Sequence, residues 1–74
     1  MEIKEFIEQL AEAVEIEDAE ALTAATEFHE LDEWSSLSVM LVIAFFDEVF
    51  DKQVGDMEIR RAVTIQDLYN IATS

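Results

Sequence analysis

Residues 34–46 read WSSLSVMLVIAFF, two serines followed closely by the longest apolar run in the chain. The run from Val39 to Phe46 contains no polar residue, so an α-helix over it would be apolar on every side. A surface helix of a small protein normally carries a single apolar stripe. We therefore predict a central helix over residues 36–50 on which the other helices pack. A small bundle can hardly cover such a helix completely, so part of it near its N-terminal end is expected to be exposed for a partner.

The rest of the chain also has helical spacing. A first helix is predicted over residues 2–14, where the apolar positions that share one face are Ile3, Phe6, Ile7, Leu10 and Val14. Residues 15–35 are predicted to be a long acidic connection held down by Leu22, Phe28, Leu31 and Trp34. A short helix is expected over residues 56–61. A last helix follows Thr64, which with Asp67 resembles a capping box. The prediction is an all-α fold, a small bundle of three long helices plus one short helix, forming a single domain over residues 1–74.

Length and composition limit the classes of protein to consider. A chain of 74 residues has a small core, and its free energy of unfolding should be only a few kcal/mol. There is no cysteine, so neither a disulfide nor a thiolate zinc site can form. The apolar run of eight residues is far shorter than the roughly 20 that cross a bilayer. We expect a soluble, cytoplasmic protein.

Charge indicates the kind of partner. Eighteen acidic residues against four basic ones give a net charge of −14 at pH 7. Such a surface repels nucleic acid and anionic membranes, so neither is expected as a partner. It attracts basic patches on other proteins, and self-repulsion favours a monomer. On charge alone, the acidity could equally serve only to keep a small domain soluble.

The serines before the apolar run have two interpretations. Ser36 lies where the central helix should begin, so its hydroxyl could be a helix N-cap that accepts a backbone hydrogen bond. The same position suits a phosphate ester, because a helix N-terminus presents unpaired N–H groups and a partial positive charge. The residues alone leave both interpretations open.

At this point the sequence resembles the acyl carrier proteins and their peptidyl and aryl carrier relatives. The resemblance covers nearly the whole chain and rests on the helical layout, on TEFHELDEWSSLSVMLVIAFFDEVF at 26–50 and on VTIQDLYNIA at 63–72. By this resemblance Ser36 carries 4'-phosphopantetheine, derived from coenzyme A, whose thiol holds an acyl or aminoacyl thioester. The implied pathways are fatty acid, polyketide or nonribosomal peptide biosynthesis, and the tryptophan before the serines is more typical of freestanding carriers. The implied partners are a phosphopantetheinyl transferase and acyl- or aminoacyl-transferring enzymes with basic docking patches. The residues implied to contact them are Ser35, Leu37, Met40, Asp47 and Glu48.

Two departures from the family pattern stand out. The attachment motif of the family is Asp-Ser-Leu, whereas this chain has Ser35-Ser36-Leu37, which implies slower loading or a dedicated transferase. Leu41 stands where fatty-acid carriers often have Glu. The alternative is a helical protein-interaction module that is not loaded, in which Ser36 is only a helix N-cap.

Neither an enzyme nor a metal site is expected. His29 is the only histidine, so Ser36 has a single candidate base, and no glycine-rich elbow accompanies it. The acidic residues around His29 lack the EF-hand pattern and read more simply as a solvated loop. The expected role is a non-catalytic carrier of a covalently bound intermediate.

Overall fold

The computed structural model describes residues 1–74 and contains four α-helices, two short 3₁₀ turns and no strand. The elements in chain order are α1 (Ile3–Ala13), η1 (Ala19–Ala21), η2 (Phe28–Glu30), α2 (Ser36–Phe50), α3 (Asp56–Arg61) and α4 (Ile65–Thr73). The all-α prediction is confirmed, with three longer helices and one short one. The bounds of the central and the short helix agree with the prediction. None of the helices combines the length and the apolar character needed to cross a membrane.

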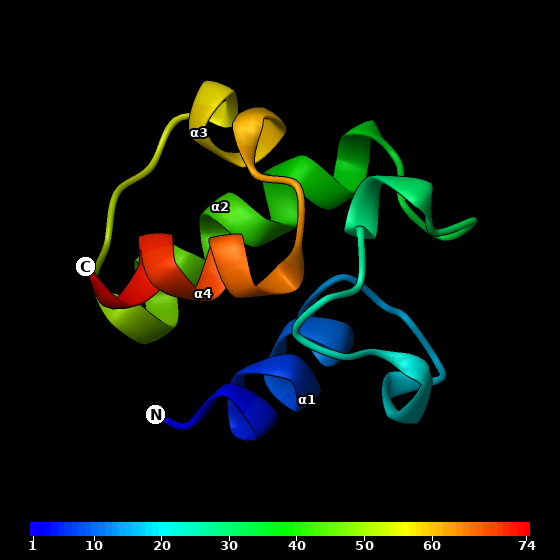
Figure 1. The fold of residues 1–74 in the computed structure, drawn as a ribbon. Coiled ribbons are helices and arrows are strands. Elements are labelled where there is room, and N and C mark those ends of the chain that lie inside the picture. The colour runs from blue at the N-terminus through cyan, green and yellow to red at the C-terminus, as the bar shows by residue number, and fades with distance from the viewer.

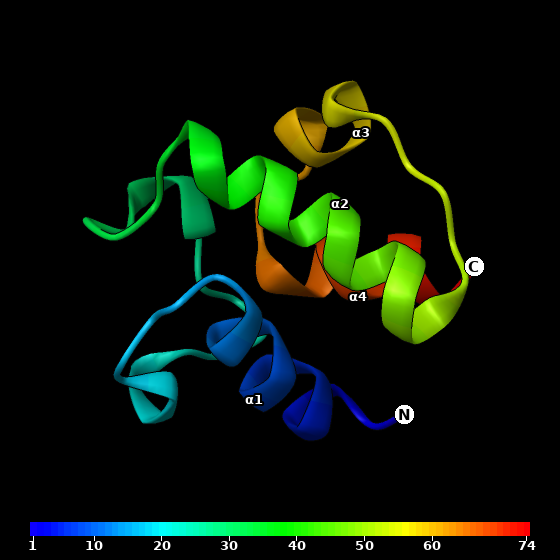
Figure 2. The same ribbon diagram turned by 180° about the vertical axis from the view of Figure 1, so that it is seen from behind.

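Helix α2 is the central element of the fold. It runs through the middle of the molecule and contacts α1, α3 and α4 (Figures 1 and 2). Its buried apolar residues are Val39, Val42, Phe45 and Phe46. Leu37 and Met40, in contrast, are 57% and 66% exposed. The predicted central helix with an exposed part near its N-terminal end is confirmed.

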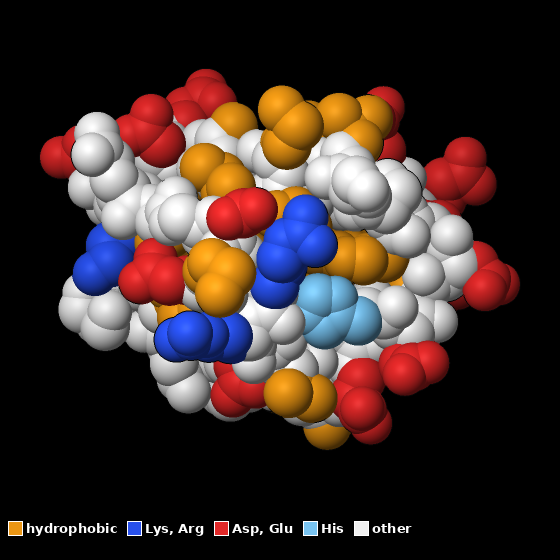
Figure 3. All heavy atoms as spheres, turned by 90° about the horizontal axis from the view of Figure 1, so that it is seen from above, with side chains coloured by type: hydrophobic (Ala, Val, Ile, Leu, Met, Phe, Trp, Pro, Cys, Tyr) orange, Lys and Arg blue, Asp and Glu red, His pale blue; other side chains and the backbone are white.

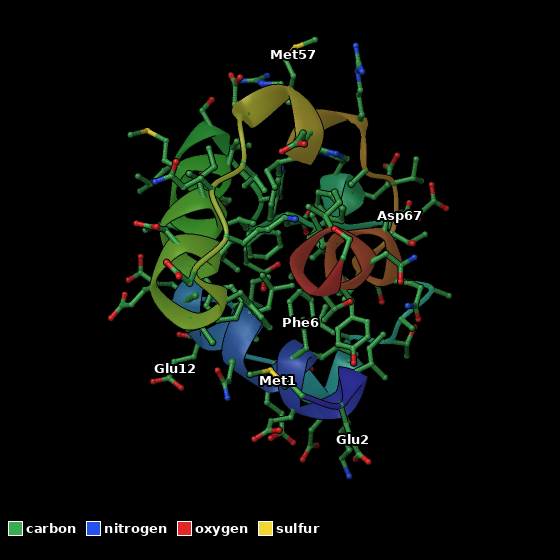
Figure 4. The ribbon with its side chains drawn as sticks, turned by 90° about the vertical axis from the view of Figure 1, so that its left-hand side faces the viewer. Met1, Glu2, Phe6, Glu12, Met57 and Asp67 are labelled. Atoms are coloured by element: carbon green, nitrogen blue, oxygen red, sulfur yellow. The ribbon has the colours of Figure 1, made fainter.

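Phe6 of α1 is the centre of an aromatic cluster. Its ring is fully buried and lies in the interior, whereas Met57 points outward from α3 (Figure 4). Ring centroids of four aromatic residues lie within 5.3 to 6.1 Å of its own, those of Phe45, Phe46, Phe50 and Tyr69. These residues come from α2 and α4, so one side chain of α1 joins three helices.

The long connection between α1 and α2 is held to the rest of the fold. Leu22 and Phe28 are buried, and Leu31 and Trp34 pack against the core, as predicted. Backbone hydrogen bonds also join the connection to the start of α4. The Ile65 N–H donates to the Thr26 carbonyl at 3.0 Å, and the Gln66 N–H donates to the Ala24 carbonyl at 2.9 Å. The connection is therefore an ordered part of the fold, despite its length.

The predicted capping box at the start of α4 is present. The Asp67 N–H donates to Thr64 Oγ1 at 3.2 Å, and the Thr64 N–H donates back to Asp67 Oδ2 at 3.1 Å. Asp67 Oδ2 also accepts the Val63 N–H at 2.9 Å. The hydrogen bonds from Val63 and Thr64 lower the pKa of Asp67 below its ordinary value of 3.8, because they favour the ionised carboxylate.

Acid should therefore weaken the start of α4. A carboxylate whose pKa is lower in the folded state stabilises the fold above its ordinary pKa, and this contribution disappears as pH falls through the folded value. We expect Asp67→Asn to lower the melting temperature at pH 7 and to flatten its dependence on pH below about 5. Asp32→Asn, in an exposed loop, controls for the loss of one charge. Parallel melting curves for the parent and Asp67→Asn from neutral to acid pH would contradict the assignment.

Candidate functional site

Ser35 is the N-cap residue of α2. Its backbone is extended, with φ −145° and ψ −179°, and the helix begins at the next residue. The interpretation of Ser36 as the N-cap, one of the two left open by the sequence, is therefore wrong, because Ser36 already has helical geometry as the first residue of α2. The sequence alone could not separate the two serines, since either could occupy a cap position.

Three nearby serines have different environments. The Ser35 N–H donates to Ser38 Oγ at 3.0 Å, and Ser38 is only 3% exposed. This pair is the capping device of α2. The side chain of Ser36 is exposed and takes no part in that hydrogen bond. Ser36 thus presents a primary hydroxyl to solvent at the start of the longest helix.

The electrostatics at Ser36 suit an anion. The unpaired N–H groups of the first turn give a helix N-terminus a partial positive charge. The first turn of α2 contains no acidic residue, so no carboxylate of that turn already uses this charge. A phosphate ester on the Ser36 hydroxyl would be favourably placed.

The segment before Ser36 is held in place by aromatic contacts. The ring of Trp34 lies edge-on to Phe28 and His29, with centroid distances of 4.7 and 5.7 Å. His29 Nε2 lies 3.0 Å from the Ala62 carbonyl oxygen, which can only accept, so the Nε2–H group donates this hydrogen bond. The connection is thereby joined to the end of α3. These contacts fix the chain two residues before the candidate attachment serine.

An apolar surface begins next to Ser36. Leu37 and Met40 are three residues apart on α2 and are therefore neighbours on its surface. Hydrophobic side chains are exposed on the face over α2 and α3, and most acidic side chains in that view lie around its edge (Figure 3). Met57 of α3 and Val63 after it are also more than half exposed. For a domain of this size, such exposed apolar side chains favour contact with another molecule.

A groove follows this surface along α2. We call it the α2–α3 groove because it lies between α2 and the segment that connects α2 to α3. It has a volume of about 380 Å³ and is lined by Met40, Ile43, Ala44, Asp47, Gln53 and Val54. Four of these six residues are hydrophobic. The groove therefore offers an apolar lining that starts one turn after Ser36 and has a carboxylate further along.

The structure brings together only some of the predicted site residues. Ser36, Leu37 and Met40 share the first turns of α2, and Asp47 lies in the α2–α3 groove with Met40. Glu48 is exposed on α2 but does not line the groove. Gln53 and Val54 were not predicted as site residues, because they belong to an irregular segment that no periodic pattern places beside α2. The pairing of Ser35 with Ser38 was not predicted either.

Nothing in the structure resembles a metal centre: no group of three or more His, Cys, Asp or Glu side chains is arranged to hold an ion. The side chain of His29 instead contacts Phe28, Trp34 and the Ala62 carbonyl.

The chain matches no protein-family description, no curated protein and no solved structure. Its resemblance to the acyl carrier proteins therefore stays a prediction from its own residues.

Proposed function

We propose that this protein is an acyl carrier protein whose Ser36 hydroxyl carries a 4'-phosphopantetheine arm. The observation that carries the proposal is the exposed hydroxyl of Ser36 in the first turn of α2, beside two serines that form the helix cap. The resemblance of residues 26–50 and 63–72 to the carrier family supports the same serine. Once attached, the arm would supply the thiol that this cysteine-free chain lacks, and that thiol would hold an acyl or aminoacyl thioester.

Loading is a phosphoryl-type transfer from coenzyme A. Ser36 Oγ forms a bond to the phosphorus next to pantetheine, and the phosphoanhydride bond to the nucleotide breaks. The nucleotide leaves as 3',5'-adenosine bisphosphate with the electron pair, and the hydroxyl proton goes to a base of the transferase. Ser36 itself contributes the nucleophile and a helix N-terminus that favours the phosphodiester. The chain is a substrate in this reaction and a carrier afterwards.

Partner enzymes would dock beside the arm. Leu37 and Met40 offer exposed apolar contacts at the attachment turn. Asp47 and Glu48 lie further along α2, where they can pair with basic residues of a partner. The α2–α3 groove offers an apolar lining for part of a thioester-linked chain. In this proposal the pathway is a lipid or secondary-metabolite pathway in which intermediates stay covalently bound.

The test is intact-mass measurement after incubation with coenzyme A, Mg²⁺ and a broad-specificity phosphopantetheinyl transferase. We expect the mass to rise by one phosphopantetheinyl group. Omission of coenzyme A is the blank, and a carrier protein of known competence is the positive control. An unchanged mass in both the parent and Ser35→Asp, which restores the Asp-Ser-Leu motif, while the positive control is fully loaded, would contradict the proposal and favour an interaction module that is not loaded.

The same assay tests the docking surface. Met40→Ala is expected to slow loading several-fold, because truncation of an exposed apolar anchor commonly costs a partner more than about 1 kcal/mol. Val49→Ala is the matched control, since Val49 is also an exposed apolar residue of α2 but lies near its other end. Equal loading rates for Met40→Ala and the parent would exclude Met40 from the transferase contact.

A further inference from the structure

A second groove lies between α1 and η1, which we call the α1–η1 groove. Its volume is about 410 Å³, and it is lined by Lys4, Ile7, Glu8, Ala19, Glu20 and Leu22. Ile7 and Leu22 are almost fully buried and form an apolar floor with Ala19. Lys4, Glu8 and Glu20 are exposed at its edge. The groove thus combines an apolar floor with a charged rim and belongs to none of the features described around Ser36.

The surface around this groove is strongly acidic. Between residues 2 and 20 the only basic residue is Lys4, and the acidic residues are Glu2, Glu5, Glu8, Glu12, Glu15, Glu17, Asp18 and Glu20. Glu8 and Glu20 make no ion pair, because the single ion pair of the structure joins Arg60 to Asp56. The carboxylates at the rim are therefore available to a cationic ligand.

We propose that the α1–η1 groove docks a basic segment of a partner protein. One or two large apolar side chains of that segment would enter the groove over Ile7 and Leu22, and flanking Lys or Arg residues would pair with Glu8 and Glu20. A volume of about 410 Å³ is enough for such side chains and lies in the usual size range of ligand sites. The carboxylates favour a partner segment with positive charge, and the apolar floor determines where on the surface that segment binds.

Other occupants fit this surface less well. A second copy of the chain would bring the same carboxylates against one another, which costs free energy. Nucleic acid and anionic membranes would be repelled by the same charges. A basic protein segment is the occupant that uses both the apolar floor and the two rim carboxylates, which outnumber the one rim lysine, Lys4.

The position of the groove indicates what such a partner could do. α1 and η1 lie at the end of the molecule opposite α3, with α2 between them (Figures 1 and 2). A segment bound in the α1–η1 groove would leave the surface formed by α2 and α3 open. A partner could therefore hold the protein while other molecules use that surface. This inference does not depend on the loading of Ser36.

The experiment uses the full chain and a designed probe. The probe is a short amphipathic helical peptide with Leu on one face and Lys on the other. Its binding is measured by the changes in the backbone amide chemical shifts of the protein. Two matched peptides replace either all Leu by Ser or all Lys by Glu. We expect the Leu/Lys peptide to shift the amides around the α1–η1 groove and both matched peptides to lose this binding. Glu8→Lys/Glu20→Lys should weaken the binding about ten-fold or more, because it reverses the charge at the rim.

The control variant is Asp32→Lys/Glu33→Lys, which makes the same change in net charge in an exposed loop outside the groove. It should weaken binding less than about three-fold, as expected for screened surface charges. Equal losses in the two variants, or undiminished binding of the Ser-substituted peptide, would mean general charge attraction and overturn the proposal. If the amide shifts around the groove grow with protein concentration in the absence of peptide, the groove binds a second copy of the chain, and this result would also overturn the proposal. If the double variant does not fold, Glu20→Lys alone provides the same comparison.

Discussion

Ser36→Ala is expected to abolish attachment of phosphopantetheine completely, because the substitution removes the only nucleophile that the proposed reaction uses. The fold should be unaffected, since the Ser36 side chain is exposed and is not part of the capping pair of α2. The measurement is intact mass after transferase treatment, with circular dichroism to establish that the variant is folded. A folded variant that gains no mass would locate the attachment site.

The neighbouring serines provide the controls. Ser35→Ala should still be loaded, and it keeps the hydrogen bond from the residue 35 backbone N–H to Ser38 Oγ, so the fold should be little affected. Peptide mapping of the loaded parent should place the added mass on Ser36. Loading that survives Ser36→Ala, or that maps to Ser35, would refute the assignment even if the protein is a carrier.

Phe6→Ala should have the largest effect on stability. Truncation of a buried phenylalanine typically costs about 3 to 5 kcal/mol, and Phe6 is fully buried among four aromatic rings from α2 and α4. A domain of this size has only a few kcal/mol of stability in total. We therefore expect the variant to be largely unfolded at 25 °C, measured by helical circular dichroism during urea titration.

Two further variants calibrate this result. Phe6→Leu retains part of the ring volume and should be of intermediate stability. Met40→Ala truncates an apolar residue that is 66% exposed, and its free energy of unfolding should change by less than about 0.5 kcal/mol. A large loss in Met40→Ala would mean that the start of α2 is core and that the proposed docking surface is wrong.

The fold could be predicted from local patterns. The apolar run of α2 has the length of a helix, and the Thr64–Asp67 box and the lone Gly55 mark the starts of α4 and α3. Each of these features depends only on residues that are close together in the sequence, so it can be recognised without the structure.

The parts of the site that could not be predicted depend on contacts between distant segments. Val54 joins Met40 in the α2–α3 groove, and the His29 side chain meets the Ala62 carbonyl, but no spacing in the sequence relates these pairs. The choice between Ser35 and Ser36 as the cap depended on a backbone angle. The α1–η1 groove likewise requires the connection to fold back on α1.

The hydrogen bonds from the start of α4 to the long connection have a consequence for the order of folding. Most helical bundles fold fast because their contacts are local. Here Ile65 must find the carbonyl of Thr26, and Gln66 that of Ala24, so a large loop must close before the connection is fixed. During synthesis the carbonyls of Ala24 and Thr26 have no α4 donor until the segment that forms α4 has emerged. The stretch at 24–26 therefore reaches its final position late, after the segments that form α1, α2 and α3 are already present.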